Sequence, residues 1–208
     1  MLKEYNKKYS QYSSFAKELH SMIEKIMQIN AVHVTHVESR AKTYESLKVK
    51  LERKGKKYKP EFSEITDLAG IRIIVYSLDD INIVEKIIKK EFSVDESRSV
   101  DKAKELKTNE FGYLSKHYIV SLNKEREQLT EYSMYVGLKA EIQVRTTLQH
   151  AWASIEHKLR YKSDIKLPEE ERRELSSIAA SFESYDKAFK RILDKYNELS
   201  EKKLTEKS

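Results

Sequence analysis

The sequence predicts an α/β fold in which a β-sheet is covered by helices and a long helix lies at each end of the chain. Short β-branched or alternating runs recur between residues 71 and 145, while both ends carry apolar residues spaced three and four apart. Strands that alternate with helices along a chain form a sheet with helices packed against it. The 208 residues are enough to bury a substantial core.

The N-terminal third is expected to contain a helix, a strand and a second helix. The first helix is predicted by apolar residues that fall on one stripe, namely Tyr12, Phe15, Leu19, Met22, Ile26 and Ile29. A β-favouring stretch follows at 32–37. Thr43 is a suitable N-cap for the second helix, which should run to about Gly55.

The middle of the chain alternates strands and helices. Residues 71–76 predict a strand buried on both faces, and Asp79 or Asp80 can cap the helix that follows, to about Phe92. A weak strand is expected at 94–100 and a polar, basic loop at 102–110. Two further strands are predicted at 118–122 and 139–145, and a helix from about 147 to 160.

The last helix begins after Pro168 and carries an apolar seam with a period of 3.5 residues, made of Leu175, Ile178, Phe182, Tyr185, Phe189, Ile192, Tyr196 and Leu199. Such a seam packs either against the similar N-terminal helix or against another copy of the chain. The expected organisation is an N-terminal helical segment (1–38), a central α/β core (39–165) and a C-terminal amphipathic helix with a polar tail (166–208).

Composition excludes several classes of protein. The chain has no Cys, which excludes disulfides, thiolate metal sites and a cysteine nucleophile. Its four glycines lie too far apart for a dinucleotide-binding or Walker-type loop, so a phosphate ligand would be held by side chains. The net charge of +6 suits an anionic ligand. No apolar run resembles a signal peptide or membrane span, which leads us to expect a cytoplasmic protein.

The run 139–145 is the most informative strand. Side chains alternate across a strand, so Glu141, Gln143 and Arg145 should share one face. The next helix also has a polar stripe, formed by His150, Ser154 and His157. Two polar faces in succession predict a shared cleft.

Two shorter segments add candidate residues. Asp67 precedes an apolar strand and could present a carboxylate at the sheet edge or cap a turn. Arg72 lies inside that strand, where a guanidinium needs a carboxylate or a ligand phosphate. Tyr113, beside Gly112, could be a platform for a nucleobase or a packing residue. The run 48–59 has seven basic residues and one acidic residue, and is either solvated or faces an anion.

Taken together, these segments resemble the synthetase domain of RelA/SpoT-type enzymes in its short, single-domain form, the small alarmone synthetases. The blocks occur in the family's order: Ser39-Arg40-Ala41-Lys42 with Ser46, Asp67-Leu68-Ala69-Gly70-Ile71-Arg72, Gly112-Tyr113-x-Ser115-x-His117, and Glu141-Ile142-Gln143-Val144-Arg145-Thr146 continuing to His150, Trp152, Glu156 and His157. The resemblance covers about 39–162.

The resemblance implies a nucleotidyltransferase-like mixed β-sheet flanked by helices. It also implies Mg²⁺-dependent transfer of pyrophosphate from ATP to the 3′-hydroxyl of GDP or GTP, giving guanosine tetra- and pentaphosphate. Asp67 and Glu141 would be the catalytic and metal-binding carboxylates, Glu141 holding the metal or acting as the base. ATP and its phosphates would contact Arg40, Lys42, Ser46, Arg72, Lys102, Lys104 and Lys107. The acceptor would contact Tyr113, His117, Gln143, Arg145 and His150.

Some short relatives suggest an alternative function. They are toxins that move pyrophosphate onto the tRNA 3′-end or onto an adenine nucleotide and are paired with an antitoxin protein. The basic run 48–59 would suit a tRNA partner. The same resemblance raises the possibility of a homo-oligomer formed through the terminal helices.

Overall fold

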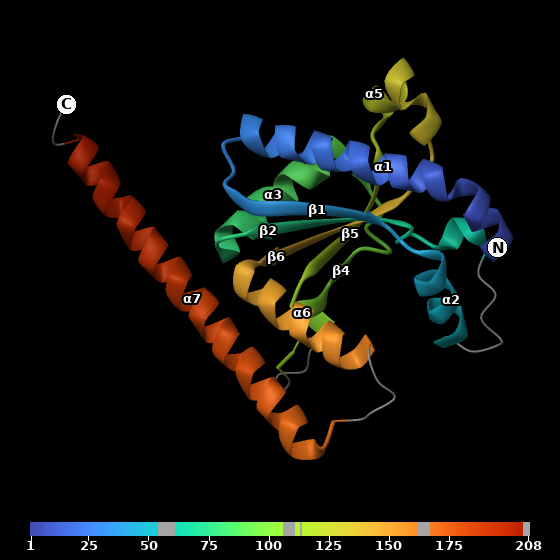
Figure 1. Ribbon diagram of the computed structural model, residues 1–208. Coiled ribbons are helices and arrows are strands. Elements are labelled where there is room, and N and C mark those ends of the chain that lie inside the picture. Colours follow the sequence, from blue (N-terminus) through green and yellow to red (C-terminus); the bar gives the residue numbers. More distant parts are fainter. Residues whose placement is uncertain (54–60, 106–110, 113, 162–166, 206–208) are drawn as a thin grey trace.

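A computed structural model describes residues 1–53, 61–105, 111–112, 114–161 and 167–205. Its centre is a mixed six-stranded sheet (Figure 1). The strands are β1 (Val34–Ala41), β2 (Ala69–Val75), β3 (Phe92–Val94), β4 (Val100–Asp101), β5 (Lys116–Leu122) and β6 (Ala140–Thr146). Their order is β1-β2-β6-β5-β3, and β4 pairs with β5 outside that path. The pairing of β2 with β6 is parallel, whereas the other pairings are antiparallel.

Helices cover both faces of the sheet (Figure 1). They are α1 (Leu2–Ile29), α2 (Tyr44–Arg53), α3 (Leu78–Glu91), α4 (Lys102–Glu105), α5 (Lys124–Glu127), α6 (Thr147–Tyr161) and α7 (Glu169–Thr205), with short 3₁₀ helices η1 (Phe62–Glu64) and η2 (Thr130–Tyr135). The main core lies where α1 and α3 pack on the sheet. None of the described helices is apolar over a length that could cross a membrane. The predicted fold class is confirmed.

The apolar stripe of α1 forms much of this core. Phe15, Leu19 and Ile23 are fully buried. Ile29 is 82% exposed, so its assignment to the buried stripe was wrong. It is the last helical residue, and Ala31 then takes a positive φ of 53° as the chain turns toward β1.

Three predicted elements differ in detail from the structure. The N-cap of α3 is Ser77, because its hydroxyl accepts the backbone N–H of Asp80 while the Asp80 carboxylate accepts the N–H of Ser77. The weak strand predicted at 94–100 is two short strands, β3 and β4, separated by a turn. The predicted loop at 102–110 begins with the short helix α4, and 106–110 lie outside the described residues.

The C-terminal helix does not pack as the first interpretation of its seam predicted. Helix α7 lies against α6 and α3, away from α1 (Figure 1), so packing against the N-terminal helix was wrong. Its contact face is made of Leu175, Ala179, Phe182 and Asp186, and the first three pack around Trp152 of α6. Most of the seam is left exposed, at Ile178, Tyr185, Phe189, Ile192, Tyr196 and Leu199. A homo-oligomer through this face stays a prediction.

A buried carboxyl group links α7 to the end of β6. Asp186 is 3% exposed, and Thr146 Oγ1 donates to its Oδ2 at 2.8 Å. Burial raises the pKa of Asp186, and the hydrogen bond from Thr146 offsets this only in part. The ionised carboxylate is therefore less stable in the folded chain than in the unfolded one.

We predict that Asp186→Asn stabilises the protein at neutral pH by on the order of 1 kcal/mol, because the amide is never charged and its carbonyl can still accept from Thr146. Because the pKa of Asp186 is higher in the folded chain than in the unfolded one, the free energy of unfolding of the wild type falls as the pH rises through the range in which carboxyl groups ionise. The difference between wild type and variant should therefore shrink as the pH falls to about 4. Urea unfolding at both pH values measures it.

The matched control is Asp194→Asn, at an exposed position on the same helix. Its free energy of unfolding should change by less than about 0.5 kcal/mol. A lower stability of Asp186→Asn at neutral pH would contradict the prediction, because it would mean that the folded state favours the charged carboxylate.

Candidate active site

Four adjacent strands bring polar side chains to the sheet face opposite α1. The register aligns Glu38 of β1 with Arg72 of β2, Arg72 with Gln143 of β6, and Gln143 with His117 of β5. The intervening residues of β2 and β6, such as Ile73 and Val144, are buried in the main core. The face toward α1 is filled by this core, so the polar site can lie only on the opposite face of the sheet.

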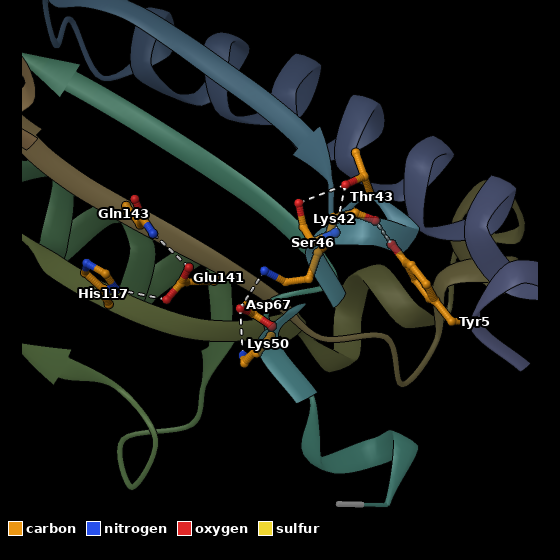
Figure 2. A network of polar contacts seen from close by, with 9 residues as sticks. All are labelled: Tyr5, Lys42, Thr43, Ser46, Lys50, Asp67, His117, Glu141 and Gln143. Carbon is orange, nitrogen blue, oxygen red and sulfur yellow. Dashed lines mark hydrogen bonds and ion pairs between the residues drawn. The ribbon is translucent and has the colours of Figure 1, made fainter. Parts of the chain in front are cut away.

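Glu141 is the centre of a hydrogen-bonded chain along this face (Figure 2). His117 Nδ1 lies 2.9 Å from its Oε1, and Gln143 Nε2 donates to its Oε2 at 2.8 Å. The guanidinium of Arg145 in turn donates to Gln143 Oε1. As the strand alternation predicts, Glu141, Gln143 and Arg145 share one face.

Burial would raise the pKa of Glu141, but this effect is outweighed. The hydrogen bond and positive charge offered by His117, together with the amide of Gln143, hold the pKa of the carboxyl below its usual value. The nearby charge of Asp67 acts in the opposite direction. The two carboxylates therefore interact electrostatically and belong to one site.

Asp67 lies two residues before β2, at the edge of the sheet, and is held by two ammonium groups. Lys50 Nζ lies 2.8 Å and Lys42 Nζ 3.0 Å from the same oxygen, Oδ2 (Figure 2). The other oxygen, Oδ1, is buried and has no hydrogen-bond partner in the described part of the chain. Burial would raise the pKa of Asp67, but the two lysines lower it below its usual value.

Lys50 is a residue of this site that sequence reasoning missed. It was counted only as part of the basic run 48–59. Helical spacing could have identified it. Lys50 lies three residues after the buried Leu47 on α2, so it lies beside the face of that helix that packs against the protein. A long lysine stem at such a position can pack along the protein while its ammonium group reaches a buried carboxylate.

Local contacts position the segment that carries Lys42. The hydroxyl of Tyr5, a fully buried residue of α1, donates to the carbonyl of Lys42. Thr43 caps α2 as predicted, since its Oγ1 accepts the N–H of Ser46 at 3.2 Å. Arg40 of β1 pairs with Gly70 of β2. A Cβ atom added at position 70 would lie 3.8 Å from the Cγ of Arg40, so the arginine stem packs over the glycine. These contacts hold the end of β1 against the start of β2.

A cavity of about 200 Å³ lies between these groups. Predicted site residues that line it are Arg40, Lys42, Asp67, Arg72, Glu141 and Gln143. Arg72 donates to the Glu38 carboxylate, one of the two partners anticipated from its place in an apolar strand. Its Nε is buried without a partner among the described residues. Glu38 lines the cavity as well, so three carboxylates and three cationic side chains from the described part of the chain surround it.

The remaining predicted site residues either do not line the cavity or lie outside the described part of the chain. Ser46 is in the first turn of α2, His117 and Arg145 belong to the hydrogen-bonded chain, and Lys102 begins α4. His150 on α6 lies beside His36 and Glu38. Burial lowers the pKa of the His150 imidazole, and the negative charge of Glu38, which acts to raise it, does not cancel this effect. Tyr113, Lys107 and the side chain of Lys104 are outside the described residues.

Such an arrangement suits phosphoryl-type transfer, in which positioning and charge neutralisation matter more than covalent chemistry. Comparisons with known proteins agree. The chain is 34% identical over 158 residues to the GTP pyrophosphokinase YwaC of Bacillus subtilis, covering 73% of this chain and 72% of that protein.

Solved structures of a Bacillus subtilis enzyme, small alarmone synthetase 1, are also similar. The form bound to its product pppGpp has a TM-score of 0.76 at 28% identity, with 93% of this chain and 98% of that chain covered. The form bound to AMPCPP has a TM-score of 0.72 at 26% identity, with 94% and 99% covered.

A sequence profile described as the region found in RelA / SpoT proteins matches residues 39–166, which contain every candidate site residue predicted above. The match spans more than half of the chain, and the conserved fold and the resemblance of the sequence blocks agree with it. This chain therefore belongs to the RelA/SpoT family.

Proposed function

We propose that this protein transfers pyrophosphate from ATP to the 3′-hydroxyl of GDP or GTP and so makes guanosine tetra- and pentaphosphate. The observation that carries the proposal is the convergence of Asp67 and Glu141, from the starts of two parallel strands, on a cavity also lined by cationic side chains. The names of the similar proteins, GTP pyrophosphokinase and alarmone synthetase, support it.

The residues present fit a Mg²⁺ ion. Mg²⁺ is bound through one or two carboxylates plus phosphate oxygens. Asp67 offers a buried oxygen, Oδ1, that has no partner among the described residues, and Glu141 is ionised on the same cavity. Both would hold the ion. When bound, Mg²⁺ would neutralise charge on the phosphate oxygens during transfer.

The lysines beside Asp67 are suited to bind the ATP phosphates. Lys42 and Lys50 both contact Oδ2 of Asp67, and Lys42 also lines the cavity, so two positive charges lie at this carboxylate. Arg40 and Arg72 line the same cavity and supply guanidinium groups for phosphate or for the nucleobase. Ser46 and Lys102, with Lys104 and Lys107, stay proposed contacts of ATP and its phosphates.

The acceptor would lie along the other half of the polar face. Gln143 lines the cavity and His117 Nδ1 lies 2.9 Å from Glu141 Oε1, which supports the proposal that both contact the acceptor. Tyr113, Arg145 and His150 stay proposed acceptor contacts. A general base works best with a pKa near the working pH, whereas that of Glu141 is held low. This favours metal binding over proton abstraction for Glu141.

The decisive experiment supplies ATP labelled at its β-phosphate together with GDP, GTP, AMP or deacylated tRNA. We expect label on GDP and GTP, and loss of the reaction on chelation of Mg²⁺ with recovery on its return. Label on tRNA alone or on AMP alone would contradict the proposal and support the toxin function with an antitoxin partner. The basic run that suggested tRNA lies partly outside the described residues.

We predict that Asp67→Asn and Glu141→Gln each lower kcat by about 100-fold or more, because each removes a carboxylate that would hold Mg²⁺ at the reacting phosphates. Steady-state kinetics measures the loss, and circular dichroism should show an unchanged fold. Glu125→Gln is the control, since Glu125 is an exposed carboxylate on α5. A turnover near that of wild type for either site variant would refute its assignment.

We predict that Lys50→Met lowers kcat/KM for ATP by about 100-fold, because one of the two ammonium groups at Asp67, which we propose to bind the phosphates, is lost while the apolar stem is kept. The matched control is Lys48→Met on the same helix, where the side chain is exposed. Equal effects of the two substitutions would show that Lys50 contributes only to general surface charge.

A further inference from the structure

Three metal-ligating side chains meet at the edge of the polar sheet face. His36 and Glu38 are two residues apart on β1, so they point to the same side of the strand. His150 is in the first turn of α6. That helix begins next to β1, since Thr35 Oγ1 and Thr147 Oγ1 are 3.3 Å apart. The fold therefore brings together two imidazoles and a carboxylate from distant parts of the sequence.

The spacing of these groups is close to that of a metal site. One donor atom from each of the three lies within 4.8 Å of the others. His36 Nε2 and Glu38 Oε1 are 3.3 Å apart, near the roughly 3.4 Å expected between two ligands of one tetrahedral Zn²⁺ ion. The ring centroids of His36 and His150 are 5.8 Å apart. A side-chain movement of His150 would therefore bring its nitrogen into the same coordination sphere as His36 and Glu38.

Two hydrogen-bonding observations point to a ligand independently of the spacing. His150 Nδ1 is buried and has no partner in the part of the chain that the structure describes. Such a nitrogen is costly unless something satisfies it. Glu38 uses Oε2 to accept from Arg72, so its Oε1 is left toward His36. A carboxylate held through one oxygen is oriented to ligate through the other, as in many metal sites.

We propose that His36, Glu38 and His150 form a binding site for a divalent transition metal ion of the Zn²⁺ class. Two imidazoles and one carboxylate suit Zn²⁺, Co²⁺ or Ni²⁺, and leave a fourth position open. Mg²⁺ prefers oxygen ligands only, so it should not compete. The three ligands of this site are different residues from Asp67 and Glu141, although Glu38 also lines the cavity that contains those two carboxylates. The positive charges of Arg72 and Arg145 near His150 will repel a cation and so lower the affinity of the His36–Glu38–His150 site for the metal ion.

The test is a titration of tag-free, EDTA-treated full-length protein with Co²⁺, followed by its visible absorption, and with Zn²⁺ by calorimetry. We expect one ion per chain, with binding retained in excess Mg²⁺. His36→Gln, Glu38→Gln and His150→Gln should each weaken binding by about tenfold or more. Circular dichroism checks that the variants fold, and using three independent substitutions guards against loss of one to misfolding.

Two histidine substitutions elsewhere serve as controls. His33→Gln changes an exposed histidine in the same segment, and His20→Gln removes the histidine that pairs with Glu24 on α1. Both should bind Co²⁺ and Zn²⁺ as wild type does. Absence of binding in wild type, binding by all three site variants as tight as that of wild type, or loss of binding in His20→Gln would overturn the proposal. None of these readouts depends on the proposed catalytic activity.

Discussion

The parallel pairing of β2 with β6 is the constraint on which the candidate site depends. It aligns Gly70 with Glu141, so that Asp67, just before β2, and Glu141, near the start of β6, lie at the same edge of the sheet. A slip of one residue in this register would turn Glu141 into the core. The buried residues Ile71, Ile73, Ile142 and Val144 resist such a slip, because each would move to the polar face. Core packing thus determines where the carboxylates lie.

Electrostatic pairing explains how so many charges share a small cavity. Lys42 and Lys50 neutralise Asp67, and His117 stabilises the charge of Glu141. Burying these charges is tolerable only because each has a partner. The proposed substrate, a nucleoside triphosphate with a metal ion, carries the same two kinds of charge and would contact the same groups.

Polar contacts at the ends of strands connect the site to the helices around it. The hydroxyl of Tyr5 joins α1 to the backbone of Lys42, and Thr146 joins β6 to Asp186 of α7. His150 brings α6 to β1 beside the Glu38 that holds Arg72. Because Tyr5, Thr146 and Asp186 are buried, loss of either of their hydrogen bonds leaves an unsatisfied partner, and the cost exceeds that of a surface contact. The helices therefore help to fix the geometry of the polar face as well as covering the core.

The sequence by itself determined the fold class, the order of most elements and the shared face of Glu141, Gln143 and Arg145, because periodicity is a local property that a run of residues carries alone. Only the tertiary structure decided which helix α7 packs against, that Lys50 reaches Asp67, and that His36, Glu38 and His150 meet. Those contacts join residues far apart in the chain. They depend on strand order and register, which no local pattern encodes.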